Sequence, residues 1–242
     1  MSIGDKLTTI AENQQKVYDK GIEQGRQAVY DEFWDSYQNN GKRTDYNYMF
    51  SGKVWNDSRL KPKHKINLTN GNNMFRLSNI TDLRPLNDVV NWSANYGVVA
   101  ICRECSSLKY VGKIGVALDG TVSAQEMFHS CSSLISVEEF MISPRVSNLN
   151  HTFYNCTSLK DIKIIGTIGQ SLDMQYSPLS KASIESIISC LSTNTTGKTL
   201  TLKKSAINSA FGINVDDATT YPEGSEYYTL RHSRDNWTIS YV

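Results

Sequence analysis

Two cysteines, Cys102 and Cys105, stand at a Cys-x-x-Cys spacing, which is that of half a zinc site or of a redox-active dithiol. The surrounding sequence favours neither chemistry. A matching second pair is absent, no histidine stands at ligand spacing, and no thioredoxin-like strand and helix flank the motif. The chain has five cysteines, and Cys105, Cys131 and Cys156 recur at one place in a longer repeated motif. We therefore predict small buried apolar thiols, with no metal and no cofactor.

Other residues that could do acid–base chemistry are not placed to do it. Glu138 and Glu139 are adjacent, and adjacent residues of a strand point to opposite faces, so they could not flank one bond. His129 follows the Phe position of one repeat, and His151 precedes the Phe position of the next. They could be neighbours, but a metal needs more than two such ligands. Nucleophile-elbow, phosphate-loop, metalloprotease and dinucleotide motifs are absent from the sequence. We expect that the protein is not an enzyme.

The elements that carry these residues are repeated units. A motif of the form Phe-x-x-Cys-Ser/Thr-Ser-Leu-x-x-Val/Ile returns every 25 to 27 residues. Three apolar or small residues are spaced by three in each unit, as in Cys131, Leu134 and Val137, and we expect them to point inward together. The copies lie at residues 102–111, 128–137 and 153–162, with a copy one residue shorter at 75–83.

A fixed period of this length predicts a solenoid, because one unit cannot bury its apolar face alone and neighbouring units must share a core. We expect short parallel strands near 110–113, 136–139 and 161–164. Val111, Val137 and Ile162 hold equivalent positions, so these strands should be adjacent.

The repeated motif resembles the BspA-type (Treponema-pallidum-type) bacterial leucine-rich repeat. That family has an Ala-Phe or Met-Phe pair before the cysteine, and Met74-Phe75 and Met127-Phe128 match it. One unit has Ile101-Cys102 at that pair, and the first unit has Leu77 at the cysteine position. Such deviations are typical of units at the end of an array. The resemblance covers about residues 72 to 168 and implies a short leucine-rich-repeat array.

Composition excludes several classes of partner. Lys and Arg number 25 against 24 Asp and Glu, and the net charge is +1, so neither nucleic acid nor a membrane surface is expected as a partner. Hydrophobic residues make up 39% of the chain, which suits a thin solenoid. Residues 1–30 lack the apolar stretch of a signal peptide, and no run of 18 apolar residues exists. We expect a protein made in the cytoplasm that leaves a cell only by lysis or within a particle.

Before the repeats, residues 1–38 are predicted to form a long helix. One apolar stripe follows a heptad spacing, and little apolar sequence nearby could cover it, so a parallel coiled coil of identical chains is favoured. An amphipathic helix packed on the next segment is the alternative. The stripe consists of Ile3, Leu7, Ile10, Gln14 and Val17.

The remaining segments flank the array. Residues 39–71 form an aromatic-rich connector. The aromatic cluster at 30–55, which overlaps it, is either a local core or a docking surface. Residues 169–242 are predicted to be a small α/β cap with helices at 180–192 and 204–211 and strands at 199–203 and 237–242. The expected fold class is an α+β solenoid: a leucine-rich-repeat array at 72–168 with parallel strands, a long N-terminal helix and this cap.

A second resemblance concerns the flanks. The stretches Asp5–Asn13 and Tyr30–Asp35 resemble the ends of repeat proteins encoded in bacteriophage tail-gene regions. That resemblance implies a homotrimeric protein of the virion tail that binds other tail proteins and a bacterial surface protein or glycan. A bacterial adhesin and a purely structural tail component are the alternatives to this function. A dimer, or docking of the N-terminal helix onto a different tail protein, is the alternative to the trimer. The candidate contact residues on the exposed strand positions are Tyr110, Ser136, Glu138, Asp161 and Lys163.

Overall fold

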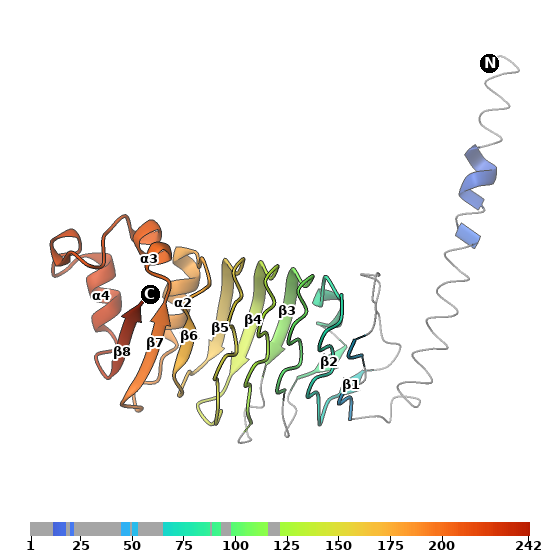
Figure 1. Cartoon of the computed structure of the whole chain (residues 1–242), viewed down its shortest axis with the longest axis horizontal. Helices are drawn as coiled ribbons and strands as arrows, with labels where there is room; N and C mark the ends of the chain where they lie inside the picture. Colours follow the sequence, from blue (N-terminus) through green and yellow to red (C-terminus); the bar gives the residue numbers. More distant parts are fainter. Residues whose placement is uncertain are drawn as a thin grey trace, which may run out of the picture.

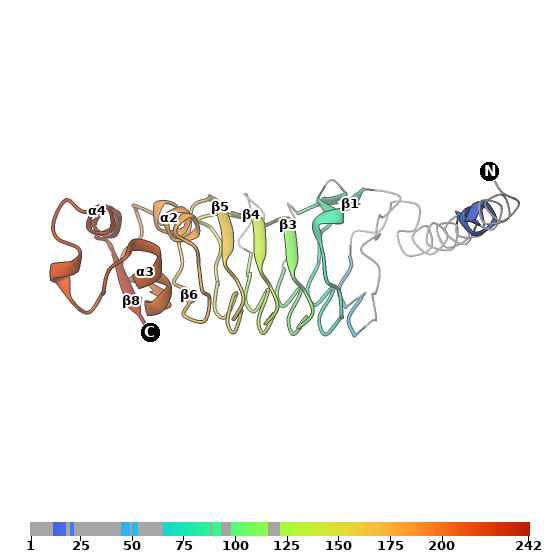
Figure 2. The same ribbon diagram turned by 90° about the horizontal axis from the view of Figure 1, so that it is seen from above.

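The computed structural model describes residues 12–17, 20–21, 45–48, 50–52, 65–87, 89–92, 98–115 and 122–242. From residue 45 onward they form a solenoid whose strands are all parallel and lie side by side along the long axis (Figures 1 and 2). The predicted solenoid with parallel strands is confirmed.

One side of the solenoid is a three-stranded sheet. It consists of β3 (Tyr110–Gly115), β4 (Ser136–Ile142) and β5 (Asp161–Gly166), in that order. Val111 pairs with Val137, and Val137 pairs with Ile162, as their equivalent repeat positions predict. Nearer the N-terminus, β1 (Ile66–Asn67) pairs with β2 (Val90–Asn91), and the short helix η1 (Arg84–Leu86) precedes β2.

On another side, five short segments without regular strand structure stack on one another. Backbone N–H groups of each segment donate to carbonyl groups of the next, for example Ala100 to Gln125 at 2.9 Å and Glu126 to Asn150 at 3.0 Å. We call this set of bonds the ladder. It satisfies backbone groups that would otherwise be buried without partners. Its segments are residues 45–48 with 50–52, 70–77, 98–104, 123–130 and 148–155.

Two residues, four apart, have left-handed backbone conformation in every ladder segment. Their φ angles lie between +54° and +63°, and only one of the ten is glycine. A left-handed residue with a side chain costs roughly 1–2 kcal/mol, so the ladder must stabilise these turns repeatedly. The pairs are Tyr48 and Gly52, Asn73 and Leu77, Ala100 and Glu104, Glu126 and Ser130, and His151 and Asn155.

The ladder begins inside the predicted connector, before residue 72. Phe50 is buried and stacks on Phe75, with 5.4 Å between ring centroids, and Tyr46 is also buried. These two aromatic side chains therefore belong to the core, whereas Tyr48 is 53% exposed. Met49-Phe50 repeats the Met-Phe pair of later units, and this sequence signal could have revealed the extra coil. The other aromatic residues of the stretch lie outside the described residues: Tyr30, Phe33, Trp34, Tyr37 and Trp55.

The predicted stack of thiols is present in the interior. Cys105, Cys131 and Cys156 are fully buried. Each thiol donates to a carbonyl oxygen of the preceding coil, which gives the small polar group a partner without a metal or disulfide. The bonds run from Cys105 to Phe75 at 2.9 Å, from Cys131 to Cys102 at 2.9 Å and from Cys156 to Phe128 at 3.1 Å.

The assignment of Leu77 to the cysteine position of the first unit is wrong. Ser78 takes that place: its N–H donates to Phe75 O at 2.9 Å, as Cys131 N–H donates to Phe128 O. Ser78 is buried, whereas Leu77 is 55% exposed at a left-handed position. The missing residue of this short unit therefore lies after the cysteine position.

Residues 169–242 form a second parallel sheet with helices in its connections. The strands are β6 (Leu172–Met174), β7 (Lys198–Leu202) and β8 (Trp237–Tyr241), in the order β6-β7-β8. The helices are α2 (Lys181–Ser189), α3 (Lys204–Phe211), η2 (Ala218–Thr220) and α4 (Glu226–His232). The two predicted helices and two predicted strands correspond to α2, α3, β7 and β8. β6 and α4 were not among the predicted elements. For α4, Ser225 is a helix-start signal in the sequence, and its hydroxyl accepts from Tyr228 N–H.

Little of the predicted N-terminal helix can be described. Residues 12–17 and 20–21 are helical and exposed, and Val17 is 73% exposed. Gln14 is exposed as well, while Ile3, Leu7 and Ile10 lie outside the described residues. The coiled coil therefore stays a prediction. Within the described part of the chain, no helix is long and apolar enough to cross a membrane.

Core packing gives a direct test of the repeat assignment. Leu134 is fully buried, whereas its neighbour Ile135 is 36% exposed. We expect Leu134→Ala to lower the free energy of unfolding by about 2–5 kcal/mol, because it leaves a cavity. Ile135→Ala is the matched control and should cost less than about 1 kcal/mol. Urea unfolding followed by circular dichroism measures both, and equal effects would contradict the inward assignment of Leu134.

Candidate functional site

The exposed side of the β3–β5 sheet gathers the predicted contact residues. Tyr110, Ser136 and Asp161 pair directly across the three strands, so they form one row. The hydroxyl of Ser136 and the carboxylate of Asp161 have no side-chain hydrogen bond or ion pair within the described residues. Both groups are therefore available to a partner.

A β-bulge places Glu138 and Glu139 on the same side of β4. Val137 and Phe140 are both buried, and the two glutamates between them stand opposite the single residue Lys163 of β5. The expectation that the glutamates point to opposite faces is therefore wrong, because the extra residue of a bulge interrupts strict alternation. Sequence periodicity alone gave no sign of the bulge.

The two glutamates have different partners, which argues against a catalytic carboxyl pair. Glu139 lies 3.5 Å from the Lys163 ammonium and 3.9 Å from that of Lys113. Both lysine side chains are more than half exposed, so these ion pairs contribute little stability. Glu138 instead accepts a hydrogen bond from Asn87 Nδ2 at 3.2 Å.

Asn87 lies at the β3 edge of this surface. Its Oδ1 accepts from Lys113 N–H at 2.8 Å, which satisfies a backbone donor at the edge of β3. Gly112 makes this approach possible, because a Cβ there would lie 1.8 Å from Asn87 Oδ1. Asn87 was not among the predicted contact residues, because its backbone partner is 26 residues away in the sequence.

Arg84 holds Tyr110 at the same end of the sheet. Its guanidinium lies 4.3 Å from the centre of the Tyr110 ring, a cation–π distance. It also makes a forked pair with Asp82, at 3.1 Å from Nε and 2.6 Å from Nη2 to Oδ2. Hydrogen bonding to Asp82 raises the pKa of Arg84. Tyr110 is thus fixed in orientation and remains partly exposed.

Helix α2 forms the wall on the β5 side. Ser183 Oγ accepts from Ile162 N–H at 2.9 Å, and Ser186 Oγ accepts from Ile164 N–H at 2.9 Å. The serine hydroxyls thereby replace the strand that would otherwise pair with this edge. The buried residues Ile184, Ile187 and Ile188 anchor the helix, as its apolar spacing predicts. The spacing gave no indication that the serines bind β5.

Four of the five predicted contact residues line one cavity of about 360 Å³ between the sheet and α2. They are Ser136, Glu138, Asp161 and Lys163. Tyr110 lies one strand away and is not part of the lining. The surface offers two carboxylates, one ammonium group and several hydroxyls in a fixed arrangement. These groups can donate hydrogen bonds to a partner molecule and accept them from it.

The Cys102–Cys105 pair and the histidines His129 and His151 lie outside this surface. Burial raises the pKa of the Cys102 thiol, while a hydrogen bond with Cys102 lowers that of Cys105. The His129 and His151 rings are neighbours, 6.1 Å apart, but both pack against Tyr154. Burial and the nearby Arg103 lower the pKa of His129. Across the described ranges, no three His, Cys, Asp or Glu side chains gather as metal ligands would.

Comparisons with known proteins identify no relative. No family model matches the chain. No curated protein matches it. No solved structure matches it.

The burial of the thiols predicts which cysteines a thiol reagent can modify in the native protein. A thiol reagent at pH 8 should modify at most one cysteine of the native protein, Cys190, because it alone is not fully buried. All five should react in denaturant. In a Cys190→Ser variant the native reaction should disappear. Rapid labelling of Cys105, Cys131 and Cys156 in the native protein would contradict the stacked arrangement.

Proposed function

We propose that this protein is a structural component of a bacteriophage tail, associated with the tail fibre or tip, whose solenoid contacts the bacterial host surface. The observation that carries the proposal is the exposed β3–β5 face. There, Ser136, Glu138, Asp161 and Lys163 line one cavity. Asp161 and Ser136 have side chains without internal partners within the described residues, which leaves them to an external ligand.

Membership of the BspA-type leucine-rich repeats belongs to the same proposal. It is supported by the recurring buried thiols at Cys105, Cys131 and Cys156 and by their carbonyl partners in the preceding coil. We assign residues 169–242 a capping role. The serines of α2 support it, since they satisfy the open edge of β5. Solenoids need such end units because an uncovered last coil exposes its core.

The N-terminal helix would then join three copies and attach them to other tail proteins. Support comes from the heptad stripe and from Val17, an apolar stripe residue that is 73% exposed in the single chain. An exposed apolar stripe is stabilised when identical helices pack along it. The repeats would form the distal part that meets the host, through a surface protein or a glycan.

Host binding tests the recognition role. Purified protein should bind intact host cells, and Asp161→Asn combined with Tyr110→Ala should reduce binding at least about tenfold, as loss of central contacts does. Asp216→Asn is the matched control, because Asp216 lies in an exposed loop of the C-terminal segment. The control should bind like the parent protein. Normal adsorption of tail particles that lack residues 72–242 would instead favour a purely structural component.

Solution mass tests the oligomer. Light scattering of the full chain should give three times the monomer mass of 27.2 kDa, and a variant lacking the first 28 residues should be a monomer. Val17→Glu should weaken assembly because it places charge in the stripe, whereas Gln15→Glu, outside the stripe, should not. A monomeric full chain would exclude self-assembly through this helix.

A further inference from the structure

The ladder stops between the fifth coil and β6. In the fourth coil, Ala124 N–H donates to Asn148 O at 2.9 Å and Glu126 N–H to Asn150 O at 3.0 Å. Leu149 and His151 hold the equivalent positions one coil later. Their backbone N–H groups find no acceptor among the residues that the structure describes. The two layers meet again further on, where the Tyr154 and Tyr176 hydroxyls are 3.4 Å apart.

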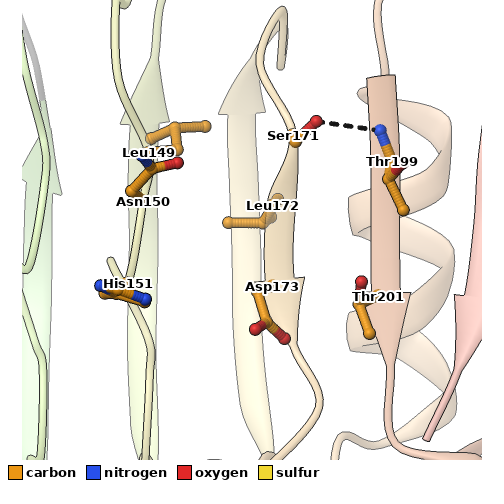
Figure 3. A pocket seen from close by; sticks show the side chains of 8 residues that line it. All are labelled: Leu149, Asn150, His151, Ser171, Leu172, Asp173, Thr199 and Thr201. Carbon is orange, nitrogen blue, oxygen red and sulfur yellow. Dashed lines mark hydrogen bonds between the residues drawn. The ribbon is translucent and has the colours of Figure 1, made fainter. Parts of the chain in front are cut away.

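A cavity of about 340 Å³ lies where the ladder is interrupted. Figure 3 shows its lining in three neighbouring rows, from the fifth coil, from β6 with the residue before it, and from β7. This cavity shares no residue with the cavity on the β3–β5 face. The lining residues are Leu149, Asn150, His151, Ser171, Leu172, Asp173, Thr199 and Thr201.

Several lining groups are held in place by neighbours that leave them able to bond further. Asp173 accepts from Gln175 N–H at 3.0 Å and from its side-chain amide at 2.7 Å, which fixes the carboxylate and leaves acceptor sites free. Ser171 Oγ accepts from Thr199 N–H at 3.0 Å and keeps its own proton to donate. Thr201 Oγ1 accepts from Ser240 at 3.1 Å and likewise keeps its proton. The site is therefore oriented before any ligand arrives.

The chemistry of the lining selects the ligand class. Hydroxyl, amide, imidazole and carboxylate groups supply donors and acceptors together, and the lining contains no lysine or arginine to hold a phosphate or sulfate. Its two leucines are buried, so little apolar side chain is offered to a lipid. A neutral, hydroxyl-rich molecule fits, because every hydroxyl group both donates and accepts hydrogen bonds.

An aromatic cluster adjoins one side of the cavity. The exposed His151 ring packs edge-on against Tyr154 at 5.2 Å, and Tyr154 packs against Tyr176 at 4.8 Å. Aromatic faces attract weakly polarised hydrogens, such as the C–H groups on one face of a sugar ring. From the interrupted ladder, the polar lining and this cluster, we propose that the cavity is a binding site for a neutral saccharide.

Ligand-observed nuclear magnetic resonance on the full chain tests the proposal. The probes are the uncharged disaccharides maltose, cellobiose, lactose and N,N′-diacetylchitobiose, with glucose 6-phosphate as a charged comparison. At least one disaccharide should show saturation transfer, and glucose 6-phosphate should bind no better than the disaccharides. His151→Gly and Thr201→Val should each weaken that binding about three- to tenfold, the effect of one lost hydrogen-bonding group. Glycine suits the left-handed backbone of residue 151 and valine suits a strand, so both variants should fold.

Matched controls carry the same substitutions elsewhere. Tyr48→Gly changes the equivalent left-handed position in the first coil, and Thr238→Val changes an exposed residue of β8. Both should bind the disaccharide like the parent protein. The proposal is wrong if no disaccharide binds, if the two cavity variants bind like the controls, or if trialanine binds at this site and the disaccharides do not. Loss of host binding in the Asp161 and Tyr110 variant is a separate result, because those residues lie outside this cavity.

Discussion

The hydrogen-bond ladder between successive coils is the constraint on which the rest of the structure depends. Because backbone N–H groups of each segment donate to carbonyl groups of the next, equivalent residues are held one above another through five coils. The interior must then accept the same kind of side chain at each level. Small thiols meet this requirement, since each reaches a carbonyl oxygen of the coil before it. The ladder also stabilises left-handed turns at residues other than glycine, such as Glu126 and His151.

Both cavities lie where this regularity ends. On the sheet side, no strand of the described residues pairs with the outer edge of β5, and Ser183 and Ser186 of α2 accept hydrogen bonds from its N–H groups. On the ladder side, the fifth coil meets β6 without backbone bonds at Leu149 and His151. Where the coils repeat regularly, the backbone groups of one coil bond to those of the next. The two cavities therefore lie where the repeated coils give way to a segment of helices and strands.

The β3–β5 face owes its polar character to an irregularity of a different kind. The bulge in β4 brings Glu138 and Glu139 to one side, and Asn87 reaches across to bind Glu138 and the backbone of β3. Gly112 leaves the room for Asn87. These contacts join residues from three different coils.

The sequence alone determined the period, the inward positions and the order of elements. Apolar residues at fixed spacing, such as Leu134 and Val137, can be buried together in only one way, and this also identified α2, α3, β7 and β8. The first coil and the place of Ser78 could have been found from the Met49-Phe50 pair and from the three-residue spacing between Phe75 and Ser78. Tertiary structure alone decided the bulge at Glu138 and the reach of Asn87. Each depends on which groups meet across a coil, and residues 24 to 27 apart meet only after stacking. Where stacking fails, as at His151, the sequence still looks regular, because the interruption lies in the layer that follows it.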